Sequence, residues 1–174
     1  GIAGASLAAS LPAELRVVLL EAEDHPGMHS TGRSAAFWSE TYGGPEIQPL
    51  TSASKAFLQA PPPGFSETGF LSPRGALHLG TSSDAASANA MLSEFSGSPV
   101  RLDQIIDADI DKFVAGRRHG WNVALWEPDC CDIDVAGLHG KYLAQARRHG
   151  VDLACRSRVH LLQWRQGHWL VETH

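Results

Sequence analysis

The sequence predicts an α/β fold that opens with a dinucleotide-binding βαβ unit of the Rossmann type. Gly1-Ile2-Ala3-Gly4 matches the last four positions of the pattern G-x-G-x-x-G, and the small residues at 5–11 predict a helix directly after it. The apolar run at residues 16–20 predicts a buried strand that ends at Glu21. Because no strand precedes Gly1 and the chain does not begin with Met, we expect a fragment that is truncated at its N-terminus.

The spacing between Gly1 and Glu21 suits a bound dinucleotide. Glycines let the backbone approach a pyrophosphate at a helix N-terminus, where free N–H groups and the helix dipole favour an anion. An acid about twenty residues further on accepts hydrogen bonds from ribose hydroxyls, and an acid there argues against a 2′-phosphate. The alternative interpretation is an ordinary helix of small residues followed by an ordinary buried strand.

Composition limits the other possibilities. The chain has 174 residues, of which 43% are hydrophobic and 19% charged, as in a globular protein. Its net charge of −5 provides no basic surface for nucleic acid. No apolar stretch approaches the roughly 20 residues of a membrane-spanning helix, and the sequence shows no signal peptide. We therefore expect a cytoplasmic protein.

Neither a metal centre nor a nucleophilic active site is predicted. Cys130, Cys131 and Cys155 are odd in number and lack C-x-x-C spacing, so we expect buried or half-buried free thiols. The sequence contains neither G-x-S-x-G nor a complete P-loop. Acyl transfer and nucleotide hydrolysis therefore have no support.

Apolar periodicity and turn residues predict the elements of the middle segment. In order, these are a helix at 45–59, a strand at 76–79, a helix from the cap Ser82 to Gly97, a helical turn within 100–110, a strand at 121–126 and a turn at Glu127-Pro128-Asp129.

The best-defined helix is expected near the end of the chain, with Asp134 as its N-cap and Gly150 after its last turn. Strands are predicted at 151–154, 159–164 and 169–173, the last two joined by a hairpin turn at Arg165-Gln166-Gly167. Because the chain stops at His174 within this expected sheet, we expect truncation at the C-terminus as well.

The block from His29 to Ser34 places hydroxyl groups and one guanidinium around a glycine, just after the loop that follows Glu21. Such a block offers hydrogen-bond donors to a pyrophosphate or to the edge of a flavin ring. The alternative is a short helix that Ser30 or Thr31 caps. Both interpretations are compatible, because a capped helix start also binds anions.

These segments together resemble the D-amino-acid oxidase superfamily of FAD enzymes. The matching features are Gly1-Ile2-Ala3-Gly4, the strand that ends at Glu21, the 29–34 block and the helix after Asp132-Ile133-Asp134. The branch of D-arginine-dehydrogenase-like and glycine-oxidase-like proteins is most similar, and Tyr42-Gly43 and Ser72-Pro73-Arg74 also match it.

The resemblance implies an FAD-binding Rossmann-like domain of the glutathione-reductase-2 type with part of an α+β substrate domain. It divides the chain into an FAD-binding segment at 1–43, a partial substrate domain at 44–130 and a return to the FAD-binding domain at 131–174. It also implies the residues that bind FAD. These are Gly1, Ala3, Gly4, Glu21, Ala22, Ser30, Thr31, Gly32, Arg33, Ser34, Ala35, Ala36 and Val159.

The same resemblance implies hydride transfer from the α-carbon of an amino acid to the flavin. Phe37, Tyr42 and Ala76 are the candidates on the substrate side. Relatives that act on D-arginine carry a histidine at position 37 and a carboxylate at position 76, so we expect an apolar D-amino acid to be preferred over arginine. Alternatively, Phe37 is simply a core residue. The residues that clamp the substrate carboxylate would lie beyond His174, so we expect residues 1–174 to be inactive alone.

Three alternatives remain at this stage. The first is an NAD-dependent dehydrogenase, because a βαβ start serves both cofactors. The second is a non-catalytic flavin-binding fragment or paralogue. The third, within the superfamily, is oxidation of a secondary amine or a 2-hydroxy acid. The sequence does not indicate whether oxygen or a quinone accepts the electrons.

Overall fold

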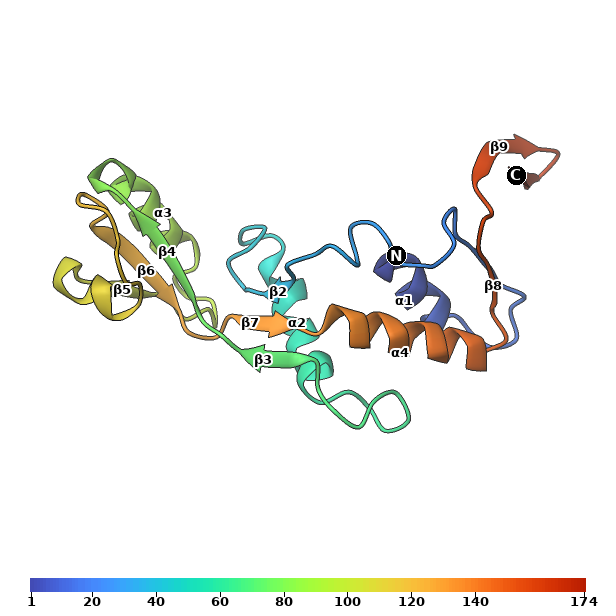
Figure 1. Ribbon diagram of the computed structural model, residues 1–174, viewed down its shortest axis with the longest axis horizontal. Coiled ribbons are helices and arrows are strands. Elements are labelled where there is room, and N and C mark those ends of the chain that lie inside the picture. The colour runs from blue at the N-terminus through green and yellow to red at the C-terminus, as the bar shows by residue number, and fades with distance from the viewer. The chain divides into compact units, whose positions relative to one another are not determined.

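The computed structural model describes residues 1–174, which form two compact units (Figure 1). Unit 1 comprises Gly1–Ala35, Pro62–Phe70 and Asp134–His174. Unit 2 comprises Ala36–Pro61 and Leu71–Ile133. None of the helices is both long and apolar enough to cross a bilayer.

Unit 1 contains the parts of the predicted βαβ unit. Helix α1 (Ile2–Ser10) packs along α4 (Val135–Arg148) (Figure 1). Strand β1 (Val18–Leu20) pairs in parallel with β8 (Asp152–Ala154). Small side chains allow the two helices to approach closely, because Ala8, Ala9 and Ala146 are buried together with Val151. The predicted helix at 5–11 is present but begins at Ile2 and ends at Ser10. The predicted strand at 16–20 is present as the shorter β1, and two of its three residues are exposed where a buried strand was expected.

Helix α4 begins and ends where its capping residues predict. The Oδ1 atom of Asp134 accepts a hydrogen bond from the Gly137 N–H at 2.8 Å, which satisfies one of the free amides of the first turn. At the other end Gly150 has a φ of 78°, the left-handed conformation that glycine adopts most easily. The prediction of this helix is confirmed.

A β-hairpin ends unit 1. Strands β9 (Val159–Arg165) and β10 (His168–Thr173) pair antiparallel, as predicted. The two residues between them, Gln166 and Gly167, both have positive φ, which is the conformation of a type I′ turn. The indole rings of Trp164 and Trp169 face each other across the strands with centroids 5.3 Å apart.

Unit 2 contains two small antiparallel sheets. The first has the strand order β2 (Phe37–Trp38), β7 (Cys131–Ile133), β3 (Leu71–Pro73). The second has the order β4 (Ala76–Gly80), β6 (Val123–Glu127), β5 (Asp103–Ile105). The helices of this unit are α2 (Gln48–Gln59) and α3 (Ala85–Glu94), and α3 contacts β6 (Figure 1).

Two predictions for unit 2 are wrong in detail. Thr81, and not Ser82, begins the helical segment before α3, because Thr81 and Asp84 form a capping box around the 3₁₀ turn Ser82–Asp84. The region 100–110 contains strand β5 before the 3₁₀ helix Asp107–Lys112, where only a helical turn was predicted. A strand of three residues is too short to show a period of its own.

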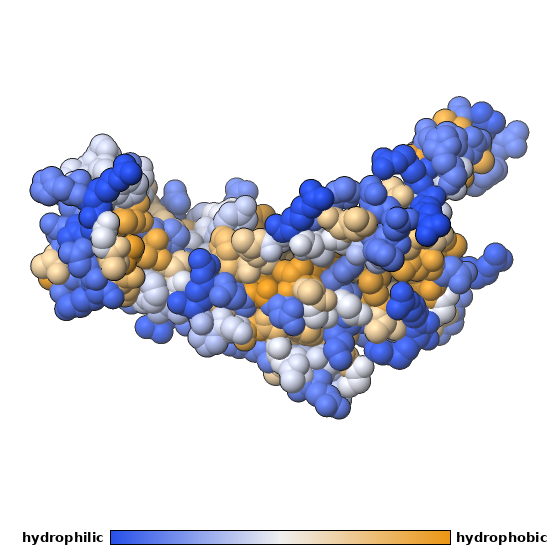
Figure 2. Space-filling model, viewed as in Figure 1, coloured by the Kyte–Doolittle hydropathy of each residue, from blue (hydrophilic) through white to orange (hydrophobic).

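Hydrophobic residues lie open to solvent in several places on the face that Figure 2 shows. Among the exposed apolar residues of unit 1 are Val18 and Leu20 of strand β1, whose exposed fractions are 58% and 38%. A parallel pair of strands is normally covered on both faces. The two-stranded sheet of unit 1 therefore presents apolar surface that this chain does not bury.

Candidate functional site

The start of α1 meets the end of β1 in unit 1. Gly1 is the N-cap of α1, and its nitrogen lies 3.7 Å from Oε2 of Glu21. The backbone N–H of Ile2 donates to Oγ1 of Thr31 at 2.9 Å. The amides of Ala3 and Gly4 belong to the first turn, which has no intrahelical acceptors, so they point outward as anion donors.

The turn at residues 26–33 closes this corner and depends on two glycines. Gly27 has a φ of +88°, and a Cβ added there would lie 3.0 Å from Cε1 of His139. A Cβ on Gly32 would overlap the carbonyl oxygen of Gly27. We call the group Gly1, Glu21, Gly27, Thr31 and Gly32 the cradle.

The predicted short helix after the 29–34 block does not form. A single helical turn closes where the Arg33 N–H donates to the His29 carbonyl at 3.0 Å, and the surrounding residues are turns. Thr31 does act as a cap, but for α1, because its hydroxyl accepts from Ile2. The alternative of a capped helix at this block is therefore wrong.

Gly4 contributes to the cradle indirectly. A Cβ on this residue would lie 3.2 Å from Cδ1 of Leu19 on strand β1. The glycine thus lets the helix pack close to the strand, which is the role of the third glycine in the fingerprint.

Glu21 is held by backbone contacts on both sides. Its N–H donates to the Ala154 carbonyl at 2.9 Å, and its carbonyl accepts from the Ser157 N–H at 2.8 Å. Val159 begins β9 two residues after Ser157. The structure therefore brings the segment that leads into Val159 next to the predicted ribose acid, with Ala22 half-buried beside it.

A histidine that the sequence analysis did not single out lies against the cradle. His139 of α4 has an exposed fraction of 7%, and its Nε2 has no hydrogen-bond partner. Burial lowers the pKa of His139 below its ordinary value, so the ring is neutral near pH 7. Its position within the first half of a well-predicted helix gave no separate signal.

The cradle has the groups that a dinucleotide site uses. The start of α1 presents backbone amides without intrahelical acceptors, and the carboxylate of Glu21 lies beside it. Four more residues that were predicted to bind the cofactor are exposed in unit 1, namely Ser30, Arg33, Ser34 and Ala35. Ala36 begins unit 2, where its carbonyl accepts from the Ile133 N–H at 3.1 Å.

Two substrate-side candidates contact each other in unit 2. The rings of Phe37 and Tyr42 meet edge to face with centroids 5.8 Å apart, and the guanidinium of Arg74 lies 5.6 Å from the Phe37 ring centroid. Phe37 has an exposed fraction of 41% and Tyr42 of 72%. Residues 1–174 therefore do not bury Phe37 as a core residue.

A buried carboxylate fixes the chain between these two rings. Glu127, only 1% exposed, accepts hydrogen bonds from Ser39 Oγ at 3.0 Å, from the Glu40 N–H at 2.8 Å and from Thr41 Oγ1 at 2.7 Å. His78 Nε2 lies 3.3 Å from the same carboxylate. Glu127 is the last residue of β6, where a turn was predicted.

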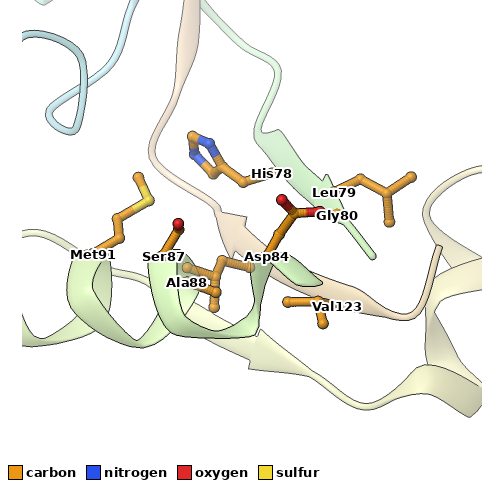
Figure 3. Close-up of a pocket in the computed structure, with 9 residues that line it drawn as sticks. His78, Leu79, Gly80, Asp84, Ser87, Ala88, Met91 and Val123 are labelled. Carbon is orange, nitrogen blue, oxygen red and sulfur yellow. The ribbon is translucent and has the colours of Figure 1, made fainter. Parts of the chain in front are cut away.

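Ala76 lies opposite Glu127 in the β4–β6 pair. Alternation along β4 puts Ala76 and His78 on one face of the sheet. A cavity of about 280 Å³ opens between β4, β6 and α3, and its lining includes His78 and the largely aliphatic residues shown in Figure 3. Ala76 itself does not line that cavity.

The cysteines have the expected burial. Cys130 and Cys131 are buried and Cys155 is half-buried, all as free thiols. Burial raises the pKa of Cys130 and of Cys131, so neither thiol is activated as a nucleophile.

Comparison with known proteins gives one family and several similar folds. A family model described as DAO, FAD dependent oxidoreductase, matches residues 1–174. Glycine oxidase from Geobacillus kaustophilus superposes with a TM-score of 0.76 at 18% identity, over 98% of this chain and 47% of that one. NikD, an unusual amino acid oxidase essential for nikkomycin biosynthesis, gives 0.77 at 20% identity, over 99% and 45%.

A third similar structure is dithionite-reduced L-α-glycerophosphate oxidase from Mycoplasma pneumoniae with FAD bound. Its TM-score is 0.78 at 13% identity, over 99% of this chain and 47% of that one. At these identities the likeness establishes the fold. The chain spans less than half the length of each of these three proteins.

Proposed function

The chain belongs to the family of FAD-dependent oxidoreductases, and from this membership we propose that the protein oxidises the α C–N bond of an amino acid. The family match selects FAD over the NAD alternative. It also agrees with the resemblance found in the motifs and with the α/β fold.

We propose that the cradle holds the adenosine diphosphate half of FAD. Glu21 would accept hydrogen bonds from the ribose, and the amides at the start of α1 would donate to the pyrophosphate. Bound FAD supplies the chemistry by accepting a hydride from the substrate. The protein residues described here bind and orient it.

Two structurally similar proteins are named as oxidases of amino acids, and this supports an amino-acid substrate. Glycine oxidase and the amino acid oxidase NikD both share this fold. The similarity to a glycerophosphate oxidase supports a second candidate, oxidation of a substrate hydroxyl group. We place the amino acid first because the matching motifs are those of the amino-acid branch.

We propose a preference for an apolar D-amino acid over D-arginine. Ala76 carries no charge, and the carboxylate nearest to it in the strand pairing, Glu127, already accepts hydrogen bonds from Ser39 and Thr41. A guanidinium bound there would have to displace those donors. Uncompensated charge in a closed pocket costs several kcal/mol, so arginine is disfavoured.

The experiment is a dye-coupled oxidation screen of the full-length gene product with D-amino acids, L-amino acids, secondary amines and 2-hydroxy acids. We expect apolar D-amino acids to give the highest kcat/KM and D-arginine a lower one. Equal or better activity on D-arginine would contradict the specificity. Flavin-loaded protein that oxidises no member of the panel would contradict the proposed reaction.

We propose further that residues 1–174 do not turn over substrate alone. The chain spans 47% of glycine oxidase, and its Phe37, Tyr42 and Ala76 include no cationic group that could form an ion pair with a substrate carboxylate. The same dye-coupled screen with the 174-residue chain tests this. Turnover of any D-amino acid by that chain would refute the proposal.

A further inference from the structure

The cavity of about 280 Å³ in unit 2 has no role in the function proposed above. It lies between strands β4 and β6 and helix α3 (Figure 3). Helix α3 has no buried residue, so it does not pack closely on the strands. Asp84 and Ser87 line the cavity and are exposed to solvent. A small molecule in solution can therefore reach it.

Most of the lining is aliphatic. Val123 and Leu125 of β6 form the sheet side of the cavity, and Ala88 and Met91 of α3 form the helix side. The two helix residues are three positions apart and so lie on one face of α3. The apolar part of a ligand would contact carbon on both sides, which favours its removal from water.

His78 brings an imidazole to this cavity. Its Nε2 lies 3.3 Å from Oε2 of Glu127, a carboxylate that is 1% exposed and accepts three further hydrogen bonds. A carboxylate only accepts hydrogen bonds, so in the neutral ring the Nε2–H donates to Glu127. The other ring nitrogen, Nδ1, is then left to accept a hydrogen bond from a ligand.

Asp84 adds a carboxylate on the same face of β4. A Cβ on Gly80 would lie 3.1 Å from Oδ2 of Asp84, so the carboxylate lies over this glycine. Gly80 follows His78 by two residues, which places both on one face of the strand, about 7 Å apart. Oδ2 of Asp84 accepts from the N–H and the hydroxyl of Thr81 at 2.7 and 2.8 Å, which leaves Oδ1 for a ligand. These two bonds lower the pKa of Asp84, so it is ionised near pH 7.

The charge of the lining favours a cation. Asp84 is negative, and no lysine or arginine lines the cavity. A ligand that carries a carboxylate would meet Asp84 without a cation to pair with. An ammonium group has three N–H donors and can donate to an imidazole nitrogen and a carboxylate together. Because each hydrogen bond spans about 3 Å, one nitrogen can lie between two strand positions that are about 7 Å apart.

We propose that this cavity binds a small apolar amine, with its ammonium group between His78 and Asp84 and its alkyl group between α3 and β6. Figure 3 shows the side chains of His78 and Asp84 on the side of the sheet where α3 lies. The ligand carries no carboxylate, which distinguishes it from the amino acid proposed as the substrate. The proposal does not depend on the oxidation reaction, because binding is measured without turnover.

The measurement uses the full-length gene product and isopentylamine as the probe. The methyl NMR signal of Met91, identified by its absence in Met91→Leu, reports on the cavity, and Met28 in unit 1 is the internal control. We expect a saturable shift of the Met91 signal with a Kd of about 1–10 mM, as suits so small a ligand, and no shift of Met28. Isopentanol and isovalerate have the same branched chain with a neutral or an anionic head group. Both should bind at least about fivefold more weakly.

Matched substitutions test the lining. Asp84→Asn keeps an acceptor for Thr81 and removes the charge, and His78→Phe keeps a ring and removes its nitrogens. Each should weaken isopentylamine by about three- to fivefold. Ala88→Leu fills the cavity and should abolish binding. Ala86→Leu adds the same side chain at an exposed position of α3 that does not line the cavity, and it should bind like the parent protein.

Four results would overturn the proposal. The first is a Met91 signal that does not shift, or that shifts only in step with Met28. The second is binding of isopentanol or isovalerate as tight as that of isopentylamine, because the charge then selects nothing. The third is unchanged affinity in both Asp84→Asn and His78→Phe. The fourth is unchanged affinity in Ala88→Leu, which places the ligand elsewhere. A full-length protein that oxidises no amino acid would refute the proposed function and leave this site unaffected.

Discussion

Thr41 donates a hydrogen bond of 2.7 Å from its hydroxyl to Oε2 of Glu127, a carboxylate from the end of strand β6. Ser39 and the Glu40 amide donate to the same group. Because Phe37 and Tyr42 flank these three residues, Glu127 fixes the backbone between two substrate-side candidates. The residue binds no substrate in our proposal, and its role is to position others.

Replacing Glu127 should therefore destabilise unit 2. In Glu127→Gln one carboxylate oxygen becomes an NH₂ donor that faces other donors, and we expect a loss of about 2–4 kcal/mol in the free energy of unfolding. Urea denaturation followed by tryptophan fluorescence measures it. Asp129→Asn is the control, since its ion pair with the exposed Arg101 side chain is long, at 3.9 Å, and should contribute less than about 0.5 kcal/mol. Equal effects of the two substitutions would contradict the role of Glu127.

The same carboxylate predicts acid sensitivity. Burial raises the pKa of Glu127, but hydrogen bonds from His78, Thr41 and the neighbouring donors outweigh burial, so the pKa is below its ordinary value. The other carboxylate of this region, Glu40, is also buried and accepts from Ser52. A carboxyl group with a lowered folded pKa stabilises the protein above its unfolded pKa and loses that contribution as pH falls through the folded pKa.

We therefore expect the free energy of unfolding to decrease as pH falls below about 4.3, the ordinary value of a glutamate. Glu127→Gln should show a smaller decrease over that range, because it carries no group to protonate. Urea midpoints of both proteins between neutral and acid pH test this. Parallel pH profiles would mean that Glu127 is not the responsible group.

Ala76 gives a test of substrate charge. Ala76→Glu adds a carboxylate at the position where the resemblance implies one in relatives that act on D-arginine, and we expect kcat/KM for D-arginine to rise by about tenfold relative to D-leucine. The new charge lies opposite Glu127, so we also expect a stability loss of about 0.5–1 kcal/mol. Ala76→Gln has the same size without the charge and serves as the control. An equal change in specificity with Gln would show that charge is not the determinant.

How far the sequence predicts this structure depends on how local each signal is. Helix α4 was predicted at both ends because Asp134 and Gly150 act on adjacent backbone groups. The hairpin was predicted because its turn contains Gln166-Gly167 between apolar strands. The short strands β2 and β7 were missed, since their existence depends on pairing between residues that are far apart in the chain.

In the candidate site, too, residues with a local sequence signal were predicted, and residues placed by long-range contacts were missed. Gly1 and Glu21 were predicted from their spacing and Thr31 from the hydroxyl-rich block at 29–34, and the structure brings the three residues together. Glu127 looked like part of a turn before Pro128, because its donors at residues 39–41 lie more than 80 positions earlier. His139 was overlooked because its position beside Gly27 arises from the parallel packing of α1 and α4.

Gly32 and Gly140 provide a last test, one inside the cradle and one outside it. In Gly32→Ala the new methyl group would overlap the Gly27 carbonyl, a backbone atom that cannot turn aside. We expect about 1–3 kcal/mol of destabilisation and FAD binding weakened by more than about tenfold. Titration of the full-length apoprotein with FAD measures the binding.

Gly140 should respond in the opposite direction. It lies in α4 directly after His139, is exposed, and a Cβ there meets no atom within 4 Å. Gly140→Ala should therefore stabilise the helix by about 0.5–1 kcal/mol and leave FAD binding unchanged, because alanine restricts the unfolded chain and favours the helix. If Gly140→Ala weakened FAD binding as Gly32→Ala does, the loss would reflect general disturbance near α4 and the cradle would lose its assignment.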